Sequence, residues 1–147
     1  MEEAKSQWTG TKEFKPYVDD NYPTLPDRDH TFIAGSSMGG LMTIYALMCY
    51  NDVFSRGAAL SPALGFSYHR NLRMIDNYVP SRRTVLYMDV GERELRYLGK
   101  KRFTETAAHL TARNVLLETR IVPDGIHSES SWEKQIPFFL NTIFYEL

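Results

Sequence analysis

The run with the clearest chemical potential is Gly35-Ser36-Ser37-Met38-Gly39-Gly40, which matches the pattern G-x-S-x-G around Ser37. In this pattern the serine projects from a sharp turn between a strand and a helix, so its neighbours two residues away must be nearly free of side chain. The N-terminus of the following helix points at a developing oxyanion, and the backbone amide of Met38 would be one donor to it. The run lacks the Gly-Lys-Ser/Thr ending of a phosphate-binding loop. It therefore predicts a nucleophilic serine rather than a nucleotide site.

A serine hydroxyl needs a general base, and the base needs an acidic side chain that orients it. Downstream of Ser37, His127 follows the last predicted strand, and the carboxylates Asp89, Glu92 and Glu94 lie at the end of an earlier one. The order nucleophile, acid, histidine is the one used by serines in strand–turn–helix elbows. The residues alone leave all three carboxylates open as the acidic partner.

Each of these residues also has a simpler interpretation. In that interpretation Ser37 is only the N-cap of a helix, and His127 is a histidine on a surface loop. The run of residues 92–96, Glu-Arg-Glu-Leu-Arg, would be a solvated charged loop. The presence of a nucleophile, a base and an acid in the required order favours the chemical interpretation.

The elements that must position these residues follow from the apolar pattern. It predicts strands over His30–Gly35, Arg56–Ser61, Thr84–Gly91 and Val115–Val122. It predicts helices over Lys12–Asn21, Ser36–Tyr50, Arg70–Tyr78 and Leu98–Arg113, and a last helix that Ser130 and Glu133 begin as a capping box. Strand and helix alternate, which is typical of an α/β three-layer sandwich with a short, mostly parallel sheet of about four strands and helices on both faces. Ligands of such folds bind at the C-terminal ends of the strands, where the candidate residues lie.

Composition bounds the remaining possibilities. The chain has 147 residues, a net charge of −1 and 43% hydrophobic residues, which fits a single domain over 1–147 with residues 1–11 as a loose arm. Without a basic excess we expect neither nucleic acid nor a membrane surface as partner. No apolar run is long enough to span a membrane and the first seven residues are not a secretory signal, so we expect a cytoplasmic protein. The single cysteine, Cys49, excludes an internal disulfide and a multi-cysteine metal site, and we expect no metal or cofactor.

Taken together, the motifs resemble the esterase family of the α/β-hydrolases that includes enterochelin-esterase-like, feruloyl-esterase-like and acetyl-esterase-like proteins. The resembling segments, in the family's order, are residues 35–41, 50–54 leading to Leu60-Ser61-Pro62, 87–94, and His127-Ser128-Glu129 followed by Trp132. The resemblance implies a serine esterase that acts on a small-molecule ester through an acyl-enzyme. It also implies Ser37 as nucleophile, His127 as base and Glu94, three residues past Gly91, as acid. With little sequence available for a lid, we expect an open site that favours short acyl groups such as acetate or butyrate.

The chain departs from the family pattern in length. The strands that precede the nucleophile strand in such hydrolases are absent, so the fold is expected to be a truncated α/β-hydrolase fold with Thr31–Ala34 as an open edge. The loop that gives the second oxyanion amide is absent with them. We expect a homo-oligomer, or the N-terminal arm, to cover this edge.

Two other functions remain open from the sequence. The first is a truncated, non-catalytic remnant that acts as a binding or assembly module. The second is an acyltransferase, in which the same acyl-enzyme passes the acyl group to an alcohol instead of water.

Overall fold

The described part of the chain, residues 9–145 of a computed structural model, is built around one parallel β-sheet. Its strands are β1 (Phe32–Ser36), β2 (Arg56–Leu60), β3 (Thr84–Gly91) and β4 (Val115–Val122), in the spatial order β1-β2-β3-β4. Every neighbouring pair is parallel, which confirms the predicted α/β sheet of about four strands. β3 is buried along its whole length, because it lies inside the sheet with helices on both faces.

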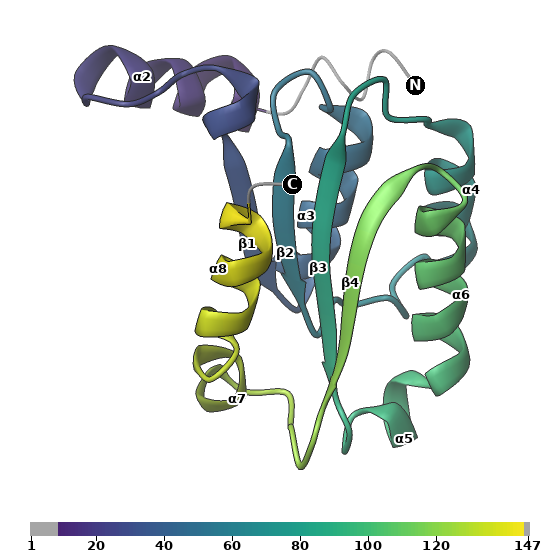
Figure 1. The fold of residues 1–147 in the computed structure, drawn as a ribbon. Helices are drawn as coiled ribbons and strands as arrows, with labels where there is room; N and C mark the ends of the chain where they lie inside the picture. Colours follow the sequence, from purple (N-terminus) through teal and green to yellow (C-terminus); the bar gives the residue numbers. More distant parts are fainter. Residues whose placement is uncertain (1–8, 146–147) are drawn as a thin grey trace.

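The helices form the two outer layers (Figure 1). On one face lie α3 (Met38–Cys49), α4 (Tyr68–Asn77) and α6 (Lys100–Thr111), and on the other lies α8 (Ile136–Phe144). The larger core fills the first interface, where Ile44 and Leu47 of α3 pack with Leu86 and Met88 of β3. A smaller core of Ala58, Tyr87 and Ile143 lies under α8. The alternation of strand and helix thus produces the expected three layers.

The N-terminal segment projects from this body. A π-helical segment, Gly10–Phe14, continues into α2 (Lys15–Asn21), which extends beyond the end of β1 (Figure 1), and a short 3-10 turn, Arg28–His30, leads into that strand. Of the predicted loose arm, residues 1–8 lie outside the described residues, and helical structure is present from Gly10. Arg28 is buried and anchors the segment, because its guanidinium donates to the carbonyls of Asn51 and Arg83.

The predicted capping box of the last helix is wrong. The segment is divided into α7 (Glu129–Glu133) and α8, and α7 begins after Ser128, whose side chain makes no capping bond. Ser130 lies inside α7 and contacts the hydroxyl of Ser128. The division follows from Pro137, which has no N–H to continue the helical ladder and therefore occupies the first turn of α8.

The helix predicted over Leu98–Arg113 corresponds to α6, which begins two residues later, at Lys100, and is preceded by a short α5 (Leu95–Leu98) that the sequence did not predict. Gly99 separates the two helices with a φ of +79°, a backbone conformation that glycine adopts without strain. Within residues 9–145, none of the helices is long and apolar enough to cross a membrane.

Candidate active site

Ser37 lies on the sharp turn that joins β1 to α3. Its backbone angles, φ 54° and ψ −117°, are unfavourable for a residue with a Cβ and persist only where the surroundings impose them. The end of β2 and the segment after it do so: the Ser37 N–H donates to the Leu60 carbonyl at 2.9 Å, and the Ser37 carbonyl accepts from the amide of Ala63 at 2.9 Å. The turn therefore holds the Ser37 side chain at the C-terminal edge of the sheet.

The glycines around this turn differ in what they allow. A Cβ on Gly35 would lie 2.6 Å from the carbonyl carbon of Gly39, which is a severe clash, and a Cβ on Gly40 would lie 3.1 Å from the carbonyl oxygen of Leu60. A Cβ on Gly39 would meet nothing within 4 Å. Of the two glycines predicted to require the absence of a side chain, Gly35 does require it and Gly39 does not. The second glycine at which the neighbouring backbone leaves little room for a side chain is Gly40, which lies against the Leu60 carbonyl.

His127 is placed between a hydroxyl and a carboxylate. Its Nε2 lies 2.8 Å from Oγ of Ser37 and its Nδ1 lies 2.6 Å from Oε2 of Glu94. The indole of Trp132 packs against the imidazole at an interplanar angle of 87° with ring centroids 4.9 Å apart. The imidazole is therefore fixed by one contact at each nitrogen and by an aromatic ring.

The three candidate acids occupy different environments. Glu94 is buried and contacts His127, whereas Glu92 is exposed and its Oε2 accepts from the backbone N–H of Asp124 at 3.2 Å. Asp89 is fully buried in β3 and its Oδ1 accepts from the backbone N–H of Ser61 at 2.9 Å. Burial raises the pKa of Asp89 to about 6. Of the three, the structure brings only Glu94 to the histidine.

Glu94 is oriented through its second oxygen. Oε1 accepts from the hydroxyl of Ser61 at 2.6 Å and from the backbone N–H of Gly91 at 3.0 Å, which leaves Oε2 to His127. Ser61 is not among the site residues predicted from the sequence. The available signal was its position at the C-terminal end of the strand predicted over Arg56–Ser61, the same edge to which the other candidates belong.

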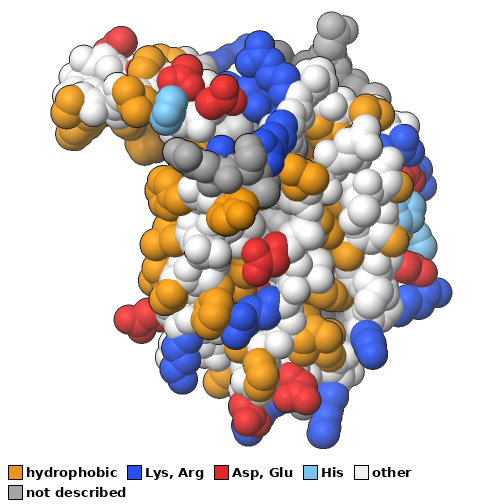
Figure 2. Space-filling view, viewed as in Figure 1, with side chains coloured by type: hydrophobic (Ala, Val, Ile, Leu, Met, Phe, Trp, Pro, Cys, Tyr) orange, Lys and Arg blue, Asp and Glu red, His pale blue; other side chains and the backbone are white. Residues whose placement is uncertain are grey.

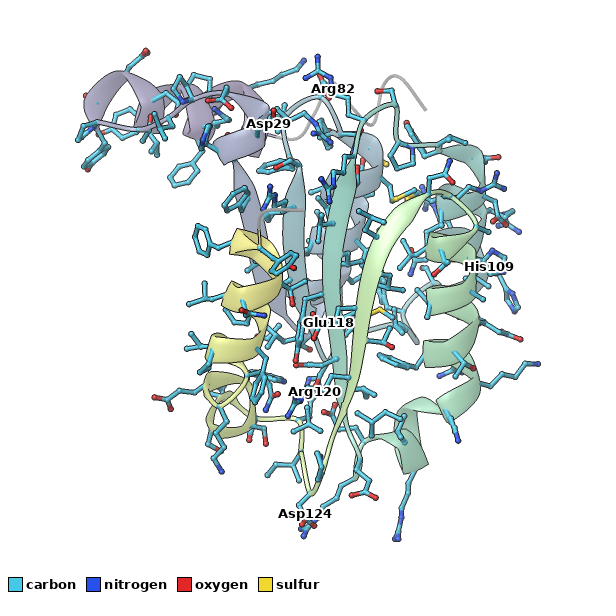
Figure 3. The ribbon with its side chains drawn as sticks, viewed as in Figure 1. Asp29, Arg82, His109, Glu118, Arg120 and Asp124 are labelled. Atoms are coloured by element: carbon cyan, nitrogen blue, oxygen red, sulfur yellow. The ribbon has the colours of Figure 1, made fainter. Side chains whose placement is uncertain are left out.

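The loops that carry the acid and the histidine are in backbone contact. Gly91 and Gly125 approach so closely that a Cβ on Gly91 would collide with the carbonyl of Gly125. The amide of Arg93 donates to that same carbonyl at 3.1 Å, and the guanidinium of Arg93 pairs with Asp124 at 2.9 Å. Figure 3 shows Asp124 at the tip of the loop after β4. These contacts fix the position of Glu94 relative to His127.

The resulting geometry has a definite chemical capacity. A neutral imidazole that accepts at Nε2 can take the proton of the Ser37 hydroxyl, and a carboxylate at Nδ1 holds the required tautomer and stabilises the imidazolium that forms. The backbone N–H groups of the first turn of α3, beginning with Met38, have no acceptor within the helix, because no helical turn precedes them. They remain available as donors. Among residues 9–145, no group of three or more His, Cys, Asp or Glu side chains is arranged to hold a metal ion.

Comparison with models of protein families identifies the family to which the chain belongs. Residues 5–142 match the model of the family described as "Putative esterase". The chain belongs to this esterase family. The match extends over the whole sheet and all the residues of the candidate site, which confirms the resemblance found in the sequence. Comparison with curated protein sequences gave no match.

Solved structures show the same fold. A ferulic acid esterase superposes with a TM-score of 0.73 at 22% identity, over 92% of this chain and 58% of its own. A fluorophosphonate-binding serine hydrolase of Staphylococcus aureus gives 0.74 at 20% identity, over 95% and 64%. An enterochelin esterase of Shigella flexneri gives 0.76 at 19% identity, over 92% and 36%. This member of the esterase family thus spans between about one third and two thirds of the length of these structures.

Proposed function

We propose that the protein is a serine carboxylic-ester hydrolase in which Ser37, His127 and Glu94 are nucleophile, general base and orienting acid. The observation that carries the proposal is the unbroken series of contacts from the Ser37 hydroxyl through both nitrogens of His127 to a buried carboxylate. The family and the hydrolases among the structural neighbours support an esterase or hydrolase activity in general. The intact contacts do not favour a non-catalytic binding or assembly module.

The proposed reaction has two stages. Oγ of Ser37 attacks the ester carbonyl while Nε2 of His127 accepts the hydroxyl proton, and the amide of Met38 donates to the oxyanion. When the tetrahedral intermediate collapses, the C–O bond to the alcohol breaks and the imidazolium returns the proton to the leaving oxygen. A water molecule, deprotonated by His127, then hydrolyses the acyl-enzyme to the carboxylic acid and free Ser37. Glu94 accepts from Nδ1–H of His127 and stabilises the imidazolium.

The surroundings of Ser37 favour small acyl groups. The side chain of His127 is 42% exposed, that of Met38 is also exposed, and open space surrounds the Cβ position of Gly39. Such an open site offers little apolar surface for a long acyl chain. We therefore propose short-acyl esters, such as acetates and butyrates, as the substrate class.

The nucleophile is tested by turnover and by covalent labelling. We expect the wild-type protein to hydrolyse p-nitrophenyl acetate and to bind one fluorophosphonate probe per chain, because the probe requires an activated serine. Ser37→Ala should abolish both, whereas Ser36→Ala, the adjacent serine at the end of β1, is the matched control and should keep both. Equal rates and equal labelling in wild type and Ser37→Ala would overturn the proposal.

The same assay identifies the acid. Glu94→Ala should lower kcat by about 10³–10⁴-fold, because the histidine loses the group that sets its tautomer. Glu92→Ala, two residues away and exposed, should leave kcat unchanged. The reverse order of the two effects would assign the role to Glu92.

A further inference from the structure

The carboxylate of Glu94 is held by more than its histidine. A carboxylate presents two equivalent oxygens and can turn either of them, or neither, toward a partner. Here Oε1 accepts the 2.6 Å bond from the Ser61 hydroxyl and the 3.0 Å bond from the Gly91 amide, and Oε2 faces His127. The Ser61 bond is charge-assisted and buried, which makes it stronger than an ordinary neutral hydrogen bond.

The backbone of Ser61 is itself held by a residue of the neighbouring strand. It is buried, and its φ of 40° is unfavourable for a residue with a Cβ. Its backbone N–H donates to Oδ1 of Asp89, a buried carboxylate on the neighbouring strand β3. Asp89 therefore holds the Ser61 backbone, and the Ser61 side chain holds Glu94. The contacts run in one series from Asp89 through Ser61, Glu94 and His127 to Ser37.

A purely structural role for Ser61 would leave its hydroxyl unexplained. A turn residue needs only an acceptable backbone conformation, which glycine adopts at a φ of 40° without strain. A buried hydroxyl, by contrast, is costly unless it finds a partner, and the partner it finds here is the side chain that orients the base.

We propose that Ser61 is a positioning residue: its hydroxyl, set by the backbone bond to Asp89, fixes Glu94 so that Oε2 stays directed at Nδ1 of His127. The proposal rests on the proposed function for its kinetic consequence and on the contacts alone for its structural one. It adds to the Ser37, His127 and Glu94 set a fourth side chain, which acts on the reaction only through Glu94.

The experiment compares two variants that lack the hydroxyl but differ in backbone freedom. Ser61→Ala keeps the Cβ and hence the strained conformation, and Ser61→Gly relieves it; both keep the backbone N–H that Asp89 accepts. The matched control is Ser55→Ala, because Ser55 is also a buried serine and its hydroxyl has no hydrogen-bond partner. Two quantities are measured: kcat and KM with p-nitrophenyl acetate, and the downfield proton resonance of Nδ1–H of His127 by NMR.

We expect both Ser61 variants to lose about tenfold or more in kcat with KM unchanged, because a hydrogen bond to a charged group is lost without any loss of substrate contacts. Both should also shift or broaden the Nδ1–H resonance, and Ser55→Ala should change neither quantity. A wild-type resonance and kcat in Ser61→Ala would overturn the proposal. Unequal effects of Ala and Gly would also overturn it, since they would assign the effect to the backbone.

Failure of the proposed function has a different signature. In that case wild type and Ser37→Ala would show the same turnover, while the Nδ1–H resonance, which requires no catalysis, would still report whether Ser61 positions Glu94.

Discussion

At the scale of residues, two buried carboxylates five positions apart in the sequence have different tasks because they receive different donors. Glu94 accepts from the Ser61 hydroxyl and the Gly91 amide and contacts His127. Asp89 is buried in the sheet, and this burial, with a smaller contribution from the nearby Glu94, raises the pKa of Asp89 to about 6 against the bond from Ser61. Burial therefore makes the charged form of Asp89 unfavourable, although Asp89 needs only an acceptor oxygen, charged or neutral, to hold the backbone N–H of Ser61.

This difference predicts a pH-dependent stability. Between the ordinary pKa of 3.8 and the raised value of about 6, the unfolded chain has lost the Asp89 proton while the folded protein still holds it. Stability therefore falls as pH rises through this window, by up to about 3 kcal/mol for a shift of about two units. Asp89→Asn keeps an acceptor for Ser61 and does not titrate. The free energies of unfolding of the variant and of wild type are measured in urea at about pH 4 and about pH 7. The variant minus wild-type difference should be more positive at about pH 7 than at about pH 4 by a similar amount, because only wild type loses stability as the pH rises. A difference that stays constant with pH would contradict this explanation.

At the scale of elements, the sequence predicts regular runs well and their interruptions poorly. The limits of β3 and β4 agree with the predicted Thr84–Gly91 and Val115–Val122, because Gly91 ends the first pattern and Pro123 follows the second. The prediction of one continuous last helix fails at Pro137. The apolar stripe continues past this residue, but Pro137 has no N–H for the helical hydrogen bonds, so a new helix begins there.

The same contrast holds for the candidate site. Ser37 and His127 follow from motif and chain order. Glu94 does not follow from the residues alone, because three carboxylates lie within six positions and only the folded loop after β3 decides which one reaches the histidine. Ser61 is not predicted because its role depends on two contacts, one with Asp89 in β3 and one with Glu94 in the loop after β3, that no local pattern records.

The turn between β1 and α3 predicts unequal effects of the same substitution. Gly35→Ala forces a methyl group against the backbone of Gly39, so we expect a loss of stability of about 2–3 kcal/mol. Gly39→Ala, in the first turn of α3 with free space around it, should fold with wild-type stability or better, because alanine favours the helix. Thermal and urea unfolding of both variants measure the difference; equal losses would show that the clash is relieved elsewhere.

At the scale of the whole molecule, the edge of the described sheet at β1 is open. Beside it lies a groove of about 770 Å³ that the π-helical segment, α2 and β1 line with Phe14, Val18, Phe32 and Ile33 among others. Phe14 and Phe144 are both more than 60% exposed, and Figure 2 shows hydrophobic side chains along the outer side of α8 and beside α2. A free strand edge next to apolar surface is a template for pairing.

We predict that a second copy of the chain covers this edge, with the two β1 strands antiparallel about a twofold axis, because an edge strand can complement itself in that way. Sedimentation should show a dimer. Ala34→Lys, at an exposed position of β1, should shift it to monomer. Thr119→Lys, exposed on the opposite edge strand β4, is the matched control and should remain dimeric. A wild-type monomer at all concentrations would contradict the prediction.

The contact between Gly91 and Gly125 has a consequence for how this site can change over time. Neither position accepts a side chain without a collision, on Gly91 with the Gly125 carbonyl and with Oε1 of Glu94 at 2.7 Å, and on Gly125 with Cα of Gly91 at 2.8 Å. A substitution at one glycine therefore cannot be compensated by enlarging the other. A side chain at either position would push the loop that carries Glu94 away from the loop that carries His127, so we expect both positions to require glycine.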